Sequence, residues 1–542
     1  MSTIAEAVVD QLIHAGVRHV FGLPGGETVE LLDALRRRGV DFVFTHNESA
    51  AVFMADAFSR VAAPRGGNPL GAVGVALTTL GPGAMNAVVG VAHAYLDRAP
   101  VVIITAQKPD ALLPDYTHQV IDLHAVFRPI TKWTAKIAPD NAAGIVQQAF
   151  AVALDGRPGP VHLQLSNEDA ALPVAKDAPA QFEPRPSSPA PDNAAVMRAR
   201  RLLEQARRPV IVAGLGLEPA RPYTQLAELA ETLAAPVVVT PKAKGALPDT
   251  HPLAAGVVGL TRTDPVYALL DEADCVLAVG FDVVELVKPW QTDAPLVWLA
   301  PWPNQDPQLP AAVELVGDLT RLLAQLTDGD FRPNPDWGAR RVASHRRSLE
   351  HRLLPPRPGH LLPQQVLGCL AEQLPPTAQM AVDVGSHKIH SSLDWPTRTP
   401  NTFFLSNGLS SMSFGLPAAL GAQLAAPERL TVCLTGDAGM SMVMGELGVM
   451  AQRELPVLVV VLNDGAIDLI RSHQVRSGKP VFATEFRSPN FAAIAAAYGL
   501  ASARITDVAQ FNEQLAGYVA RPHPLVLEVM LDPISYPTTP RR

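Results

Sequence analysis

The stretch "LTGDAGMSM", residues 434–442, decides the fold class and raises the first chemical question. An apolar run ends here at Asp437, which is flanked by glycine and alanine rather than by bulky side chains. A carboxylate at the end of a buried strand is costly unless something positive neutralises it. The stretch therefore indicates a strand end that holds a cation or a charged ligand.

Short apolar runs, typical of buried strands, alternate with helical patterns along the whole chain. Alternating strands and helices predict parallel sheets that are covered by helices on both faces. We therefore expect an α/β protein of doubly wound parallel sheets, in which ligands bind beyond the carboxyl ends of the strands. The clearest strand candidates lie in 19–26, 41–46, 71–79, 100–106, 208–214, 235–241, 275–280, 378–385, 430–436, 456–464 and 524–531.

The chain length and the proline distribution predict three domains. A chain of 542 residues is too long for one hydrophobic core. Two proline-rich stretches, 173–193 and 331–363, have the stiff, polar composition of linkers. We therefore expect domains at 1–172, 190–330 and 360–535.

Composition excludes several classes of function. A formal net charge of −8 argues against a nucleic-acid-binding surface, which needs a basic face. The three cysteines form no CxxC motif, which favours a reducing compartment. The first residues lack the pattern of a signal peptide, and the aliphatic runs are too short to span a bilayer. We expect a cytoplasmic protein that acts on small molecules, with no membrane association.

A second strand-end acid gives Asp437 a partner. Asp464 ends the next predicted strand, so the two carboxylates could meet at one edge of the sheet. Two such anions repel each other unless a cation lies between them, and hard oxygen ligands suit Mg²⁺. Gly436, Ala438 and Gly439 leave room for backbone N–H groups and a helix start near Ser441 to face a diphosphate. Taken singly, either aspartate would fit a capped turn.

The pattern GD-x-G followed by N-D resembles the signature of the thiamin diphosphate (ThDP)-dependent enzymes. The resemblance covers nearly the whole chain, in the order of that family's pyrimidine-binding, middle and diphosphate-binding domains. It implies Mg²⁺ ligands at Asp437, Asp464 and the carbonyl of Ala466. The third position of the motif is usually glycine but is Ala438 here. The implied diphosphate-binding residues are Gly436, Ala438, Gly439, Asp464, Ala466 and Ile467.

Five further segments resemble cofactor-binding parts of the same family. "THNESAA" (45–51) implies that Glu48 is the catalytic glutamate, whose carboxyl binds the pyrimidine ring and promotes removal of the C2 proton of the cofactor. "LSNGLSSMSFGLPAALGAQ" (405–423) implies that Met412 supports the folded cofactor, beside Leu409 and the carbonyl of Ser410. "DVGSHKIH" (383–390), "LPGG" (23–26) and "GPGAMN" (81–86) imply contacts from Gly385, Ser386, His387, Pro24, Gly25 and Asn86.

Within that family, local matches resemble the acetolactate synthases, and most closely their FAD-independent catabolic type. "YTHQVIDLHAVFRPITKW" (116–133) implies that His118 and Gln119 face a 2-oxo acid. The implied reaction decarboxylates pyruvate and joins the two-carbon unit to a second pyruvate, giving 2-acetolactate. The implied substrate-pocket residues are Glu27, Arg471, His473 and Gln474. Glu27 replaces the usual lysine, and Arg471 with His473 predicts a basic wall.

The resemblance also implies partners and leaves alternatives open. Because active sites in this family are shared between chains, we expect a homodimer or homotetramer. The ThDP machinery also serves 2-oxo acid decarboxylases and aldehyde carboligases, although the tandem histidines of simple decarboxylases do not occur near residue 118. A non-catalytic ThDP-binding paralogue is disfavoured by Glu48. A nicotinamide dehydrogenase is the weakest alternative, because the Gly-rich turn "GLGLEP" (214–219) lacks the GxGxxG spacing of a dinucleotide-binding site.

Overall fold

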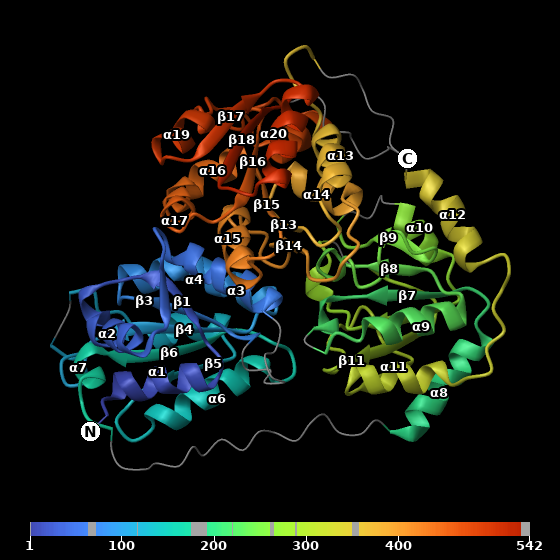
Figure 1. The fold of residues 1–542 in the computed structure, drawn as a ribbon. Helices are drawn as coiled ribbons and strands as arrows, with labels where there is room; N and C mark the ends of the chain where they lie inside the picture. Colours follow the sequence, from blue (N-terminus) through green and yellow to red (C-terminus); the bar gives the residue numbers. More distant parts are fainter. Residues whose placement is uncertain are drawn as a thin grey trace.

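The computed structural model describes residues 2–62, 72–115, 118–174, 192–218, 220–260, 265–287, 290–349 and 357–532. It contains three six-stranded sheets in which every strand pairing is parallel, each covered by helices (Figure 1). This confirms the predicted α/β class and the three doubly wound sheets. Within the described ranges, no helix is long and apolar enough to cross a membrane.

The first unit, blue to cyan in Figure 1, has the strand order β2-β1-β3-β4-β6-β5. Its strands are β1 (His19–Leu23), β2 (Asp41–Phe44), β3 (Gly74–Thr78), β4 (Val101–Gln107), β5 (Trp133–Lys136) and β6 (Val161–Ser166). Its helices are α1 (Ile4–His14), α2 (Val29–Arg38), α3 (Glu48–Val61), α4 (Pro82–Leu96), α5 (Leu123–Phe127), α6 (Ala142–Leu154) and α7 (Asn167–Ala170).

The second unit has the order β12-β11-β10-β7-β8-β9, which is the order of dinucleotide-binding sheets. Its strands are β7 (Pro209–Ala213), β8 (Val237–Val239), β9 (Ala254–Val257), β10 (Cys275–Val279), β11 (Leu296–Ala300) and β12 (Val313–Val316). Its helices are α8 (Asn193–Gln205), α9 (Tyr223–Leu233), α10 (Pro265–Asp271), α11 (Leu319–Thr327) and α12 (Gly338–Leu349).

The third unit, orange to red in Figure 1, has the order β14-β13-β15-β16-β18-β17, which repeats the pattern of the first. Its strands are β13 (Gln379–Val382), β14 (Phe403–Leu405), β15 (Thr431–Gly436), β16 (Val457–Asn463), β17 (Ala501–Ile505) and β18 (Leu525–Met530). Its helices are α13 (Pro363–Gln373), α14 (Ser386–Asp394), α15 (Gly415–Ala425), α16 (Asp437–Val443), α17 (Leu447–Gln452), α18 (Asp468–Arg476), α19 (Phe491–Ala497) and α20 (Val508–Ala520).

Helices α3 and α15 join the first and third units (Figure 1). Both helices are buried on nearly all sides. Helix α15 is almost wholly apolar, as expected for a helix enclosed by protein, whereas α3 also buries the polar side chains of Glu48 and Asp56. The two helices are in close contact at Gly421, which has no side chain. A Cβ atom there would lie 2.2 Å from the backbone oxygen of Met54. One core cluster therefore extends from β1 across both helices to β16.

Two local expectations differ from the structure. Helix α16 begins at Asp437 rather than near Ser441, because the Asp437 carboxylate accepts the backbone N–H of Ala438 and supports the first turn. The segment 331–338 is no free linker: Trp337 is buried and donates a hydrogen bond to the carbonyl of Pro209. Helix α12 then packs on α10 and β9, beyond the predicted boundary at 330. Most of the other predicted linker, 173–193, lies outside the described residues.

Candidate active site

A cavity of about 200 Å³ opens at the carboxyl edge of the third sheet. Its walls come from the ends of β13, β15 and β16 and from the start of α18. The strand order reverses between β13 and β15, and ligands of doubly wound sheets bind at such a reversal. The lining residues are Val384, Gly385, Ser386, His387, Ser410, Met412, Gly436, Asp437, Ala438, Gly439, Leu462, Asp464, Ala466, Ile467, Asp468, Leu469 and Ile470.

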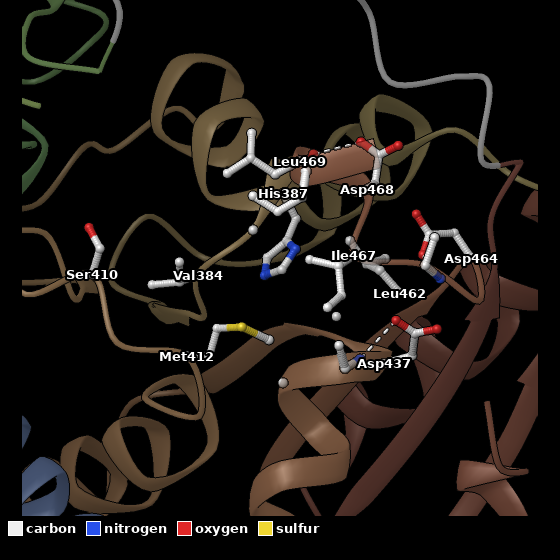
Figure 2. Close-up of a pocket in the computed structure, with 17 residues that line it drawn as sticks. Val384, His387, Ser410, Met412, Asp437, Leu462, Asp464, Ile467, Asp468 and Leu469 are labelled. Atoms are coloured by element: carbon white, nitrogen blue, oxygen red, sulfur yellow. Dashed lines mark hydrogen bonds between the residues drawn. The ribbon is translucent and has the colours of Figure 1, made fainter. Parts of the chain in front are cut away.

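Asp437 and Asp464 lie at one end of this cavity (Figure 2). The Asp437 carboxylate accepts the N–H groups of Ala438 and Gly465, each at 2.8 Å. Asp464 accepts the N–H of Ala466 at 3.1 Å through Oδ1, but its Oδ2 is buried without a hydrogen-bond partner. Burial and the nearby Asp437 carboxylate raise the pKa of Asp464 to about 7. A cation between the two carboxylates would relieve both costs.

The chemistry of this donor set fits Mg²⁺. Among the residues that the structure describes, no three His, Cys, Asp or Glu side chains gather into a metal site. The two carboxylates therefore leave coordination positions for a backbone carbonyl, water and ligand phosphate, which is the usual mixture around Mg²⁺. Ala466 lines the same cavity, as the sequence predicts for the carbonyl ligand.

The middle of the cavity fits a diphosphate. Gly436 and Gly439 keep its wall open: a Cβ atom at Gly439 would lie 2.3 Å from Oδ2 of Asp383. The Nε2 atom of His387 is buried without a hydrogen-bond partner, and the ring extends into the cavity in Figure 2. Burial lowers the pKa of His387 to about 3, so the ring is neutral and can donate one N–H. Helix α14 also starts at this wall, at Ser386.

Ser410 and Met412 lie at the opposite end of the cavity from the two aspartates (Figure 2). The structure thus brings together all the residues that the sequence assigns to the diphosphate side. Of the predicted cofactor-binding residues Leu409, Ser410 and Met412, only Leu409 does not line the cavity. Its backbone N–H instead approaches Asp97 at 3.5 Å.

A second cluster of candidate residues surrounds Glu48 in the first unit. Glu48 begins α3 and is buried, and Asn86 of α4 donates a hydrogen bond of 3.0 Å to its Oε2. A Cβ atom at Gly83 would lie 3.1 Å from Oε1 of Glu48. These residues follow β2 and β3, beside the order reversal between β1 and β3. The Glu48 cluster therefore occupies the position in the first sheet that the cavity occupies in the third.

The "LPGG" turn lies against this Glu48 cluster. A Cβ atom at Gly25 would lie 2.5 Å from Oγ1 of Thr79, so Gly25 packs on the turn that leads into α4, whereas Pro24 is exposed. Glu27 accepts a hydrogen bond of 2.9 Å from Thr79 and pairs with Lys108 at 3.3 Å. Glu27 carries a negative charge where related sequences have a lysine, and Lys108 of the same unit neutralises this charge.

His118 and Gln119 are both exposed. Gln119 also packs on Gly81, where a Cβ atom would lie 2.8 Å from Cβ of Gln119, so it lies at the edge of the Glu48 cluster. In one chain, no residue from the described part of the first unit lines the cavity in the third. The two predicted halves of the active site are therefore separate in a single chain.

The predicted basic wall differs in the structure. The guanidinium of Arg471 pairs with Asp468 at 2.8 Å, and Asp468 also accepts the hydroxyl of Ser386 at 2.6 Å. His473 is exposed, and Gln474 hydrogen-bonds the backbone of Phe482 instead of lining the cavity. Asp468 was not identified from the sequence, although an acid four residues after Asp464 at a helix start was the available signal.

Comparisons with known proteins agree with this geometry. The C-terminal TPP binding domain of thiamine pyrophosphate enzymes matches residues 383–529, the N-terminal TPP binding domain matches 2–126, and the central domain matches 196–326. Thiamine pyrophosphate is another name for ThDP. The cavity in the third unit and the Glu48 cluster in the first lie within the two TPP binding domains.

Curated relatives match over nearly the whole chain. The acetolactate synthase isozyme 3 large subunit of Escherichia coli is 31% identical over 94% of this chain and 91% of that protein. A probable acetolactate synthase large subunit of Methanocaldococcus jannaschii is 29% identical over 98% and 92%. A probable 2-ketoarginine decarboxylase of Pseudomonas aeruginosa is 32% identical over 95% and 92%. The chain therefore belongs to the ThDP-dependent enzymes, in the superfamily of 2-oxo acid decarboxylases and carboligases.

Proposed function

We propose that the cavity in the third unit binds ThDP and Mg²⁺, with Asp437, Asp464 and the carbonyl of Ala466 on the metal. The single observation that carries this proposal is the buried, unpartnered Oδ2 of Asp464 beside the Asp437 carboxylate. Bound ThDP supplies a carbon nucleophile that adds to a 2-oxo acid and accepts the electrons released when CO₂ leaves. Residues around the diphosphate would be Gly385, Ser386, His387, Gly436, Ala438, Gly439 and Ile467.

We further propose that two copies of the chain complete each active site, as a homodimer or a homotetramer. The separation of the Glu48 cluster from the cavity supports this proposal, because the cofactor must touch both. The matching strand orders of the first and third units also support it, since they present equivalent edges that can face each other across a twofold axis. Glu48 would then hold a proton against the pyrimidine ring, oriented by Asn86.

For the reaction, we propose condensation of two 2-oxo acids, with pyruvate as donor and acceptor and 2-acetolactate as product. Two of the relatives are named as acetolactate synthase large subunits, and they support this choice. Gln119 lies at the edge of the Glu48 cluster and would contact the carboxylate or carbonyl of the substrate. His118 would approach from the same loop.

We also propose that the chain works without FAD. The turn after β7 is where a dinucleotide phosphate would lie in a sheet of this order. That turn is filled: Glu285 accepts the N–H of Leu215 at 2.9 Å, and a Cβ atom at Gly216 would lie 2.6 Å from the Trp302 ring. Purified protein should therefore show no flavin absorbance. A bound flavin would contradict this proposal.

A second candidate function is decarboxylation of a 2-oxo acid with a cationic side chain. The observation that favours it is the 32% identical relative named as a 2-ketoarginine decarboxylase. Asp468 is compatible with it, because this carboxylate lines the cavity and already pairs with a guanidinium, that of Arg471. The two candidates differ in the products that they release.

Product analysis separates these candidates. Purified protein is incubated with ThDP, Mg²⁺ and pyruvate, without FAD, and then with 2-ketoarginine. Acetolactate with CO₂ from pyruvate is the expected result. Acetaldehyde with CO₂ would assign a pyruvate decarboxylase, and turnover of 2-ketoarginine alone would favour the second candidate. Absence of ThDP binding would contradict the proposed function as a whole.

A further inference from the structure

The loop 406–414, between β14 and α15, carries Ser410 and Met412 into the cavity. It is conformationally unusual, because Ser410 has φ of 53° and Ser413 has φ of 70°. Residues other than glycine occupy this left-handed region at a cost, so surrounding contacts must hold the loop in place. Lys388 donates a hydrogen bond of 3.1 Å to the Ser410 hydroxyl. The backbone position of Ser410 and Met412 depends further on what fixes the two ends of the loop.

Asp383 holds the end of the loop near α15. Its carboxylate accepts the N–H of Ser413 at 3.1 Å and that of Phe414 at 3.2 Å, and it also accepts the hydroxyl of Thr435 at 3.0 Å. Asp383 follows β13 and is fully buried. This end of the loop is therefore fixed from within the third unit.

Asp97 holds the other end, and it comes from the first unit. It follows α4 and is fully buried. Its Oδ1 accepts the N–H of Asn407 at 3.0 Å and that of Gly408 at 3.3 Å, and Leu409 N–H approaches its Oδ2 at 3.5 Å. Three successive N–H groups thus face one carboxylate, an arrangement that binds anions.

The second unit supplies the counter-charge. Lys242, in the turn after β8, lies 2.6 Å from Oδ1 of Asp97, and His93 lies 3.0 Å from its Oδ2. Burial alone would raise the pKa of Asp97, but the charges of Lys242 and His93 hold that pKa well below its usual range. Asp97 is therefore an anion that touches all three units.

Two neighbouring contacts tie the loop to the same point. The ring of His93 lies 2.9 Å from the hydroxyl of Ser406, which in turn accepts the N–H of Ser411 at 2.9 Å. Gly408 is pressed on the end of α4, because a Cβ atom there would lie 2.7 Å from the carbonyl oxygen of Leu96. The loop is thus held by charge, by hydrogen bonds and by close packing.

We infer that Asp97 is a positioning residue for the cofactor cavity: its carboxylate, neutralised by Lys242, fixes the backbone of 407–409 and so places Ser410 and Met412. This inference rests on the proposed function for its consequence, since the loop matters through the ThDP that it would contact. Asp97 itself does not line the cavity and would touch neither cofactor nor substrate.

The test is Asp97→Asn in the full chain, with two readouts besides turnover. Amide hydrogen exchange of the peptide covering 406–412 reports on the loop, and the Kd for ThDP at saturating Mg²⁺ reports on the cavity. We expect faster exchange and a Kd raised about tenfold, because the binding-competent loop conformation is less populated. Unchanged exchange, or faster exchange with an unchanged Kd, would overturn the inference.

Asp282→Asn is the matched control. Asp282 is equally buried and also pairs with arginines, Arg98 at 3.0 Å and Arg157 at 3.2 Å, but it does not hydrogen-bond the loop. We expect its exchange in 406–412 and its Kd to stay close to those of the unmodified protein. Equal effects of the two substitutions would show a general loss of stability and would overturn a positioning role.

Two further outcomes remain decisive. If Asp97→Asn does not fold, Gly408→Ala displaces the same loop without touching a charge; it should weaken ThDP binding in the same way, and an unchanged Kd would overturn the inference. If the unmodified protein does not bind ThDP, the proposed function fails, whereas the exchange readout still decides whether Asp97 holds the loop.

Discussion

The side-chain amide of Asn86 donates a 3.0 Å hydrogen bond to Oε2 of Glu48, so α4 fixes the carboxyl group at the start of α3. Asn86→Ala should leave Glu48 in place but free to rotate. We expect the rate of C2 hydrogen–deuterium exchange of bound ThDP to fall roughly tenfold, the value of about one hydrogen bond. Nuclear magnetic resonance of the exchanging cofactor measures this rate.

Glu48→Gln and Met197→Ala are the two controls for this exchange measurement. Glu48→Gln should abolish exchange while ThDP stays bound. Met197, exposed on α8 of the second unit, should be replaceable by alanine without effect. If Asn86→Ala exchanged as fast as Met197→Ala, the hydrogen bond would have no part in the function of Glu48.

Asp464→Asn should change the thermal stability of the protein in opposite directions in the absence and in the presence of Mg²⁺ and ThDP. Without Mg²⁺, it removes a buried, unpartnered carboxylate that is repelled by Asp437, so the melting temperature should rise. With Mg²⁺ and ThDP, the stabilisation seen for the unmodified protein should be lost, because the metal lacks a ligand. Thermal unfolding in both conditions measures these changes.

Asp468→Asn is the control for that prediction, since Asp468 lines the same cavity but is held by Ser386, Arg471 and Ser472. It should keep Mg²⁺-dependent stabilisation by ThDP. Identical behaviour of the two variants would argue that acidity in general, rather than the Asp437–Asp464 pair, binds the metal.

Glu446 predicts a pH dependence of stability. Burial raises the pKa of Glu446 from its ordinary value of 4.5 to about 8, with a smaller contribution from nearby Glu48. Between these values the folded state holds a proton that the unfolded state has lost. Stability should therefore fall as the pH rises from 4.5 to 8, by on the order of 1 kcal/mol per pH unit from this group.

Glu446→Gln should remove that slope, because the amide keeps an oxygen for the N–H of His46 but carries no proton to lose. Urea unfolding midpoints at pH 5 and pH 8 should differ less in the variant than in the unmodified protein. An equal difference in both proteins would show that another group causes the pH dependence.

The substitution Ala438→Gly restores the glycine that is usual at this position of the motif and tests whether the alanine weakens ThDP binding. Ala438 lines the cavity, so Ala438→Gly should open it slightly and lower the Kd for ThDP by about two- to threefold, less than 1 kcal/mol. Gly439→Ala is the opposite case, since its Cβ atom would lie 2.3 Å from Asp383 and should weaken binding strongly. Calorimetric titration measures the Kd of both variants. Tighter binding by Gly439→Ala would contradict the diphosphate site proposed at the wall formed by Gly436 and Gly439.

The sequence predicted several of the strands that are buried on both faces. Runs such as 456–464 and 524–531 became the central strands β16 and β18 because continuous β-branched and aliphatic residues suit enclosed parallel strands. Seven strands were not among the candidates: β5, β6, β9, β11, β12, β14 and β17. Polar residues interrupt the apolar pattern of β5, β6 and β17, whereas β11 was missed although it is wholly apolar. Trp337 was missed for a related reason: surrounding prolines suggested a linker, whereas one buried ring docks the segment.

The candidate site was predictable where motifs are contiguous. Residues 436–439 and 464–467 follow neighbouring strands, so topology alone brings them together. Contacts between residues far apart in the sequence were not predictable. Nothing local indicates that Asp97 reaches the backbone of 407–409, or that Lys108 compensates Glu27, because these partners are fixed by packing across the whole chain.

The measurement that tests the central claim most directly is complementation between two inactive chains. Glu48→Gln and Asp437→Ala are each expected to abolish C2 exchange of ThDP. If the site is shared between copies, a mixed dimer has one site with both lesions and one site with neither. Unfolding and refolding equal amounts together should then restore about a quarter of the unmodified exchange rate. A mixture as inactive as its components would contradict a ThDP site built from the Glu48 cluster of one chain and the Asp437–Asp464 cavity of another.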